Sequence, residues 1–136
     1  MKKIKIYFAA PLFSKAEQDF NATLAYNLEM KGFEVFLPQE KGKNKIGRDL
    51  FKICVMGLDA ADLVIAILDG ADADSGTCWE CGYAYAKNIP VIGLRTDFRV
   101  TGDTGGFNSM IYFSSTIINE PHDLMQKLLD AIKKVS

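Results

Sequence analysis

The sequence predicts an α/β fold built around an open parallel sheet of five strands. Short apolar segments rich in β-branched and aromatic residues recur along the chain, and segments with apolar residues at helical spacing lie between them. The apolar segments lack the polar alternation of a half-exposed strand, so we expect helices on both faces of the sheet. At 136 residues, the chain suits a single domain, residues 1–136, with one core.

Residues that stop a strand or open a loop follow the predicted strands. Pro11 follows the first strand and Pro38 the second, and an acidic loop follows the third. A polar, glycine-rich loop comes after the fourth strand. The strands are predicted at residues 4–10, 33–37, 63–68, 91–94 and 112–118.

The predicted helices have start signals that local chemistry explains. Ser14 and Glu17 match a capping box at the start of the first helix. A polar and exposed loop, residues 40–48, precedes the second helix. Asn119 can cap the last helix, with Pro121 in its first turn. The helices are predicted at residues 14–32, 46–61 and 77–87, in a short segment after residue 107, and from residue 119 onward.

Strands that alternate with helices imply right-handed crossovers, and the flavodoxin-like strand order 2-1-3-4-5 accommodates them best. In this order, ligands bind beyond the carboxyl ends of strands 1 and 3, where the direction of winding reverses. The loops at this place would be residues 9–14 and 69–75. The acidic loop is the second of these, so composition and topology indicate the same cleft.

Composition limits the class of ligand and the compartment. With 24% charged residues and a formal net charge of −1, the chain has no basic field for nucleic acid, so any nucleotide-like ligand should be small. No apolar run approaches the roughly 20 residues of a membrane-spanning helix, and the first residues continue into a strand pattern without a signal peptide. Three cysteines, an odd number, fit reduced thiols. We therefore expect a cytoplasmic protein that does not bind membranes.

Four carboxylates follow the third predicted strand, and they have unequal prospects. Asp69 and Asp72 are most simply turn formers, and the spacing lacks the glycine and distal glutamate of an EF-hand. Asp74 is the aspartate we expect to be functional. Glu80 follows Thr77 by three residues and can complete a capping box, where the helix N-terminus would keep it ionised. An ionised carboxylate is also what covalent glycosyl transfer needs.

Other residues allow a structural and a functional interpretation. Cys78 and Cys81 form a C-x-x-C motif at a helix start, as in a thioredoxin-like redox pair, but the glutamate between them adds negative charge. Tyr7 and Phe13 can be core aromatics or can flank the predicted cleft. The single histidine, His122, leaves no histidine-based catalysis and no multi-histidine metal site.

Three segments resemble the nucleoside 2-deoxyribosyltransferase family. They are KIYFAAPLF at the first strand, ADLVIAILDGADADSGTCWECGYAYA at the centre, and IGLRTDFR followed by FNSM near the end. Among them, the D-x-G-T-x-x-E-x-G-Y-A core is the most specific. The resemblance implies exchange of a 2-deoxyribosyl group between purine or pyrimidine bases, with retention of configuration. It also implies the parallel sheet described above, a homo-oligomer, and no metal or organic cofactor.

The same resemblance assigns catalytic roles by position. Glu80 resembles the nucleophile that forms a covalent deoxyribosyl ester. Tyr7 resembles the tyrosine that orients this carboxylate, and Asp74 the acidic residue that contacts the base and assists its protonation. The chemistry suits these residue types, because a carboxylate can stabilise and trap the oxocarbenium-like state that forms when an N-glycosidic bond breaks.

Substrate-binding roles follow from the resemblance as well. Phe13 resembles an aromatic of the base pocket, and Gly76, the glycine of the D-x-G-T-x-x-E-x-G-Y-A core, is assigned to substrate binding with it. Asn108 and Met110 resemble a segment that reaches a neighbouring subunit's site to hold the sugar 5′-hydroxyl. Since a second base and not water must attack the intermediate, we expect apolar groups such as Phe13 and Trp79 to exclude water.

One departure and two alternatives stay open. Cys54 stands in the helix before the third strand, where relatives often have Asp or Asn. The related 2′-deoxynucleoside 5′-phosphate N-hydrolases share the nucleophile but need a basic phosphate site after the first strand; residues 10–14 contain no arginine, and Asn108 suits a neutral hydroxyl. The other alternative is a nucleotide-binding module without catalysis.

Overall fold

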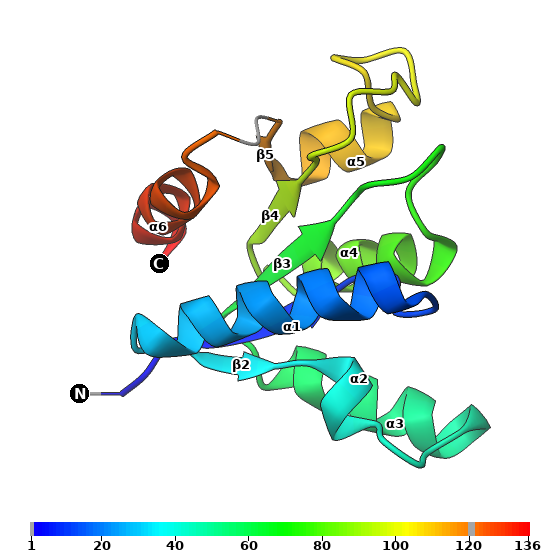
Figure 1. The fold of residues 1–136 in the computed structure, drawn as a ribbon, viewed down its shortest axis with the longest axis vertical. Helices are drawn as coiled ribbons and strands as arrows, with labels where there is room; N and C mark the ends of the chain where they lie inside the picture. The colour runs from blue at the N-terminus through cyan, green and yellow to red at the C-terminus, as the bar shows by residue number, and fades with distance from the viewer. Residues whose placement is uncertain (1, 120–121) are drawn as a thin grey trace.

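Five parallel strands form one sheet in the order β2-β1-β3-β4-β5 in the computed structural model, which describes residues 2–119 and 122–136 (Figure 1). All the pairings between neighbouring strands are parallel. The strands are β1 (Lys5–Ala9), β2 (Glu34–Phe36), β3 (Leu63–Ile67), β4 (Val91–Leu94) and β5 (Thr116–Ile118). The predicted fold class and strand order are confirmed.

Helices cover both faces of the sheet, as predicted. The core on one face is formed with α1 and α6, and the core on the other face with α3, α4 and α5 (Figure 1). Within the described part of the chain, no helix has the length and apolar character to cross a membrane. The helices are α1 (Lys15–Met30), α2 (Pro38–Lys41), α3 (Gly47–Asp59), α4 (Ser75–Ala86), α5 (Ser109–Ser114) and α6 (Leu124–Val135).

The alternation of side chains along β1 decides which residues meet which helices. Ile6 and Phe8 are buried in the core with α1, whereas Tyr7 and Ala9 are buried in the core with α3 and α4. Successive side chains of a strand point to opposite faces of the sheet. Full burial of a large apolar side chain such as that of Phe8 contributes roughly 1.5–3 kcal/mol. Tyr7 therefore faces α4, the helix that carries Glu80.

The segment before β3 follows the predictions with small differences. The capping box of α1 is confirmed, because the Glu17 backbone N–H donates to the Ser14 hydroxyl at 3.1 Å and the Ser14 backbone N–H donates to the Glu17 carboxylate at 2.8 Å. The predicted loop at residues 40–48 is shorter. Its first residues belong to α2, in which Pro38 takes the first helical position, and α3 already starts at Gly47.

The boundary between α5 and β5 differs from the prediction. The predicted strand at residues 112–118 is wrong in its first half, because α5 continues to Ser114 and β5 comprises only Thr116–Ile118. A cap at the start of α5 favours helix over strand in this segment. The side chain of Asn108 accepts a hydrogen bond from the Met110 backbone N–H at 2.9 Å and caps the helix.

The last helix starts later than predicted. Asn119 does not cap it, because α6 begins at Leu124 with Asp123 as the N-cap residue in a left-handed backbone conformation. The predicted place of Pro121 in the first turn lies outside the described residues. The apolar stripe of α6 packs on the sheet as predicted, with Leu128 and Ile132 buried.

Candidate active site

Tyr7 and Glu80 meet at the carboxyl ends of β1 and β3. The Tyr7 phenol donates a short hydrogen bond to Oε2 of the Glu80 carboxylate, although the two residues are 73 positions apart in the chain. Parallel strands bring this about, because the loops that follow β1 and β3 leave the same edge of the sheet and α4 packs back across it. The structure thus joins the two residues that we predicted to act together.

The start of α4 is set by Asp74 and not by Thr77. Asp74 is the N-cap residue, and its Oδ2 accepts hydrogen bonds from the Thr77 backbone N–H at 3.0 Å and from the Thr77 hydroxyl at 3.1 Å. The predicted capping box between Thr77 and Glu80 is therefore wrong. Glu80 lies in the second turn of α4, which begins at Ser75, and its carboxylate is free of any capping role.

Burial has a larger effect on Glu80 than the helix N-terminus. The pKa of the Glu80 carboxyl group is raised to about 7, mainly because burial disfavours its charged form. The hydrogen bond from Tyr7 lowers the pKa and the negative charge of Asp74 raises it. The expectation that the helix N-terminus keeps Glu80 fully ionised is wrong, since the effect of the helix dipole is confined to the first turn. Near pH 7 both forms of Glu80 are populated.

Tyr7 is a fixed hydrogen-bond donor. It is completely buried, and burial together with the nearby charge of Glu80 raises the pKa of its phenol far above the ordinary value. The proton consequently stays on the phenol, which can only donate to the carboxylate. The Tyr7 ring stacks on the Phe36 ring, with 5.2 Å between the ring centroids and 15° between the ring planes.

Cys54 completes this group from α3. Its half-buried thiol interacts with the Tyr7 phenol, and its pKa is raised by burial and also by the charge of Glu80, while the contact with Tyr7 lowers it. The residue that departs from the expected Asp or Asn therefore lies next to the candidate nucleophile. A neutral thiol at this place adds no charge beside Glu80.

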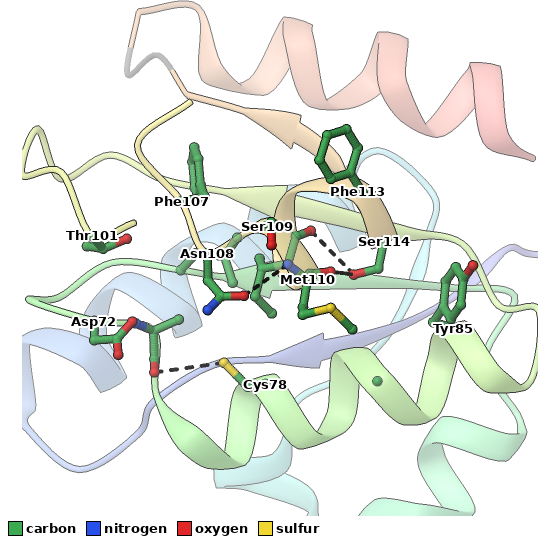
Figure 2. Close-up of a pocket in the computed structure, with 14 residues that line it drawn as sticks. Asp72, Cys78, Tyr85, Thr101, Phe107, Asn108, Ser109, Met110, Phe113 and Ser114 are labelled. Carbon is green, nitrogen blue, oxygen red and sulfur yellow. Dashed lines mark hydrogen bonds between the residues drawn. The ribbon is translucent and has the colours of Figure 1, made fainter. Parts of the chain in front are cut away.

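Asn108 and Met110 lie in a different place. They line a cavity of about 630 Å³ between α4 and α5, to which Cys78 and Tyr85 of α4 also contribute (Figure 2). The residues lining this cavity do not include Glu80. Successive residues rotate by about 100° around a helix, so Glu80 lies on the opposite side of α4 from Cys78 and Tyr85. We refer to this cavity as the α4–α5 groove.

The α4–α5 groove is apolar and open to solvent. Tyr85, Met110 and Phe113 are 65%, 78% and 76% exposed, respectively. The Met110 side chain extends from α5 toward α4, and the Asn108 side chain caps α5 at the end of the groove (Figure 2). An exposed apolar surface of this kind on a protein is typical of a contact with another molecule.

The remaining predicted residues lie in the loop after β1 and in the first half of α4. Phe13 is 76% exposed in the loop after β1, and Gly76 lies in the first turn of α4, where an added Cβ would be 3.3 Å from the Asp74 carboxylate. Trp79 bridges α4 and α3 through an edge contact with Phe51 at 5.7 Å between ring centroids.

Residues 6–128 match the family model described as nucleoside 2-deoxyribosyltransferase. The chain belongs to the nucleoside 2-deoxyribosyltransferase family. The comparison with curated proteins gives no match.

Solved structures of similar fold span nearly the whole chain. A conserved protein from Enterococcus faecalis V583 is 28% identical with a TM-score of 0.76, over 96% of this chain and 99% of that chain. A 2-deoxyribosyltransferase from Bacillus psychrosaccharolyticus is 27% identical with a TM-score of 0.71, over 88% and 89% of the two chains. A 2-desoxiribosyltransferase from Leishmania mexicana shares the fold at 19% identity, with a TM-score of 0.76 over 93% and 97%.

The cysteine pair of this deoxyribosyltransferase family member lacks the properties of a redox site. Burial raises the pKa of Cys81 to about 12, and burial together with the charges of Asp72 and Asp74 raises the pKa of Cys78. A redox-active thiol requires a lowered pKa. Among the described residues, no group of three or more His, Cys, Asp or Glu side chains is arranged to hold a metal ion.

One structural element of the site was missed by sequence reasoning. Arg95, only 2% exposed, donates hydrogen bonds to the backbone carbonyls of Leu68 and Gly70, and Asp69 accepts hydrogen bonds from the backbone N–H and hydroxyl of Thr96, both at 2.6 Å. Asp69 is thus more than the turn former that we expected. Together these contacts tie the loop after β3 to the loop after β4. The available signal was an arginine directly after a buried apolar strand.

Proposed function

We propose that this protein transfers a 2-deoxyribosyl group between nucleobases, with Glu80 as the nucleophile. The observation that carries the proposal is the partly buried Glu80 carboxylate that accepts a hydrogen bond from Tyr7. Membership of the nucleoside 2-deoxyribosyltransferase family supports the same assignment. Deoxynucleosides and free nucleobases are the proposed substrates.

In the first step, the ionised Glu80 attacks C1′ of the deoxyribosyl group through Oε1, since Oε2 is held by Tyr7. The C1′–N bond breaks, its electron pair moves to the base, and the base leaves after gaining a proton. Asp74 assists this protonation. One of its oxygens, Oδ2, caps α4, so the contact with the base falls to Oδ1.

In the second step, a nitrogen of another base attacks C1′ and the ester bond to Glu80 breaks. The carboxylate is regenerated, and the attacking nitrogen of the incoming base gives up its own proton to Asp74, which balances the proton that Asp74 helped to deliver to the departing base. Two displacements at the same carbon retain its configuration. Phe13, Trp79 and Phe51 limit the access of water to the ester, which favours transfer over hydrolysis.

The α4–α5 groove supports a homo-oligomer with shared sites. Asn108 and Met110 line a groove that does not include the Glu80 of their own subunit, and the exposed Met110 and Phe113 provide an apolar contact surface. We infer that this surface packs on a second copy, in which Asn108 holds the sugar 5′-hydroxyl. Its neutral amide suits a hydroxyl better than a phosphate.

The test incubates the protein with a deoxynucleoside and a different free base and looks for the exchanged nucleoside by chromatography. Exchange is the expected result, accompanied by a mass increase of one deoxyribosyl unit on the protein when the acceptor base is left out. Release of base from a deoxynucleoside monophosphate without any exchange would assign the protein to the N-hydrolases instead.

A further inference from the structure

Phe36 stands directly beside Tyr7 in the sheet. The two residues are partners in the parallel register of β1 and β2, so their side chains point to the same face and their rings stack at 5.2 Å. Phe36 is the last residue of β2 and packs against the core that contains Tyr7. Its half-buried ring is thus the neighbour of Tyr7 on the side of the sheet that holds Glu80.

The contact of Phe36 with α3 requires a glycine. A Cβ added at Gly57 would lie 2.8 Å from two atoms of the Phe36 ring, which is closer than real Cβ atoms approach a neighbour. Gly57 is buried in the interior of α3, where glycine costs about 1 kcal/mol relative to alanine. The close approach of the Phe36 ring gives this unfavourable residue a physical reason.

We propose that Phe36 is a positioning residue for the transfer reaction proposed above: packed against Gly57, its ring holds the Tyr7 phenol in line with the Glu80 carboxylate. The inference rests on the proposed function for its catalytic meaning, whereas the contacts themselves do not depend on it. Phe36 stacks on the ring of Tyr7, so the proposed effect on Glu80 passes through Tyr7.

The physical effect of this arrangement is on the charge of Glu80. The titratable groups that interact with Glu80 are Tyr7 from β1, Cys54 from α3, and Asp74 and Cys81 from the start and body of α4. Of these, Tyr7 is the group that lowers the pKa of Glu80. A phenol that is free to turn donates a weaker hydrogen bond, and the pKa of the buried carboxyl group then rises further.

The decisive variant is Phe36→Leu, which removes the stacking ring and keeps an apolar side chain. We expect the pKa of Glu80, followed by carbon-13 NMR of the glutamate carboxyl groups without substrate, to rise above the wild-type value. We also expect kcat for base exchange to fall by about tenfold while KM changes by less than about threefold, since misalignment affects the reacting groups more than binding. Phe36→Tyr keeps the ring and should restore both values.

Two further variants make the test specific. Gly57→Ala forces the Phe36 ring to shift and should move the pKa of Glu80 in the same direction as Phe36→Leu. Phe33→Leu removes the same ring from the opposite face, where Phe33 packs on the core with α1 and α6. This matched control should lower stability without changing the pKa of Glu80.

An unchanged or lowered pKa of Glu80 in Phe36→Leu would overturn the positioning role, even if activity were lost. If the pKa of Glu80 rises in Phe36→Leu but the wild-type protein performs no base exchange, the contact between Phe36 and Tyr7 is supported and the proposed reaction is overturned. The two failures are distinguishable because the NMR titration needs no substrate.

Discussion

The two sides of α4 are built on different principles. On one side, the partly buried Glu80 carboxylate is hydrogen-bonded to Tyr7 and lies beside groups from β1 and α3. On the other side, Cys78 and Tyr85 face an open apolar groove whose other wall is α5. The first side is enclosed by neighbouring elements, whereas the second exposes the apolar side chains of Tyr85, Met110 and Phe113 to solvent. The contrast supports the proposal that a second copy of the chain packs on the α4–α5 groove.

The largest expected effect is on the buried side. Glu80→Ala should lower base exchange by at least about 10³-fold, because removal of a nucleophile eliminates the covalent pathway. The mass adduct of one deoxyribosyl unit should disappear as well. Rates are measured by chromatography and the adduct by intact-protein mass spectrometry. Retained exchange would show that the buried side of α4 is not the reactive side.

On the groove side of α4, we expect substitution to weaken the binding of the sugar and not to remove the reacting group. Asn108→Ala should reduce kcat/KM by about 10- to 100-fold through loss of a buried hydrogen bond to the sugar, with the fold unchanged by circular dichroism. If sites are shared, mixing Glu80→Ala with Asn108→Ala after mild dissociation should restore part of the activity, because some mixed sites contain both intact residues. No recovery in verified mixed oligomers would contradict a shared site.

Stability should depend on the charge of Glu80. The folded-state pKa is raised from 4.5 to about 7, so the folded protein binds the proton more tightly than the unfolded chain. The stability from this proton is present below pH 4.5, is lost as the pH rises to about 7, and amounts to about 3 kcal/mol. As the pH rises from about 4 to about 8, the free energy of unfolding of Glu80→Gln should therefore increase by about 3 kcal/mol relative to that of wild type.

Urea denaturation of wild type and Glu80→Gln at about pH 4 and about pH 8 measures this difference in the free energy of unfolding. Catalysis should also depend on the charge of Glu80, but activity should increase with pH where stability decreases. The ionised form attacks, so kcat/KM should fall as the pH decreases through about 7. A stability difference that does not vary with pH would mean that Glu80 is not buried as described.

Asp74 caps α4 and has a proposed role in protonation of the base, and substitution can separate the two. Serine is also a good N-cap residue, so Asp74→Ser should leave stability within about 0.5 kcal/mol of wild type, whereas Asp74→Ala should lose about 1 kcal/mol. Both variants lack the second carboxylate oxygen, and both should lose exchange activity by about tenfold or more. Equal activity of Asp74→Ser and wild type would restrict Asp74 to capping.

The smallest effect is expected for the cysteines. A Cys78→Ser, Cys81→Ser double variant should keep exchange activity within about threefold, because neither thiol takes part in the proposed reaction. Some loss of stability is expected from a polar group at the buried Cys81 position. Complete loss of activity in a folded double variant would restore the thiol interpretation.

Much of this protein follows from its sequence, because the relevant signals are local. Uninterrupted apolar segments such as residues 63–68 predict strands that helices cover on both sides, and the handedness of crossovers leaves few strand orders. The acidic loop at residues 69–75 then falls at the point where the strand order reverses. Fold class, strand order and the meeting of Tyr7 with Glu80 could therefore be predicted from composition, spacing and family resemblance.

Only the tertiary structure decided what depends on packing. Thr77 and Asp74 are both good N-cap residues, and the backbone geometry of the loop selects Asp74. Burial by distant segments, which no local pattern encodes, raises the pKa of Glu80. The rotation of α4 against the sheet places Glu80 toward Tyr7 and Cys78 toward the α4–α5 groove. The sequence indicated which residues are candidates for the chemistry, and long-range packing decided the pKa of Glu80, its alignment with Tyr7 and the side of α4 on which each residue lies.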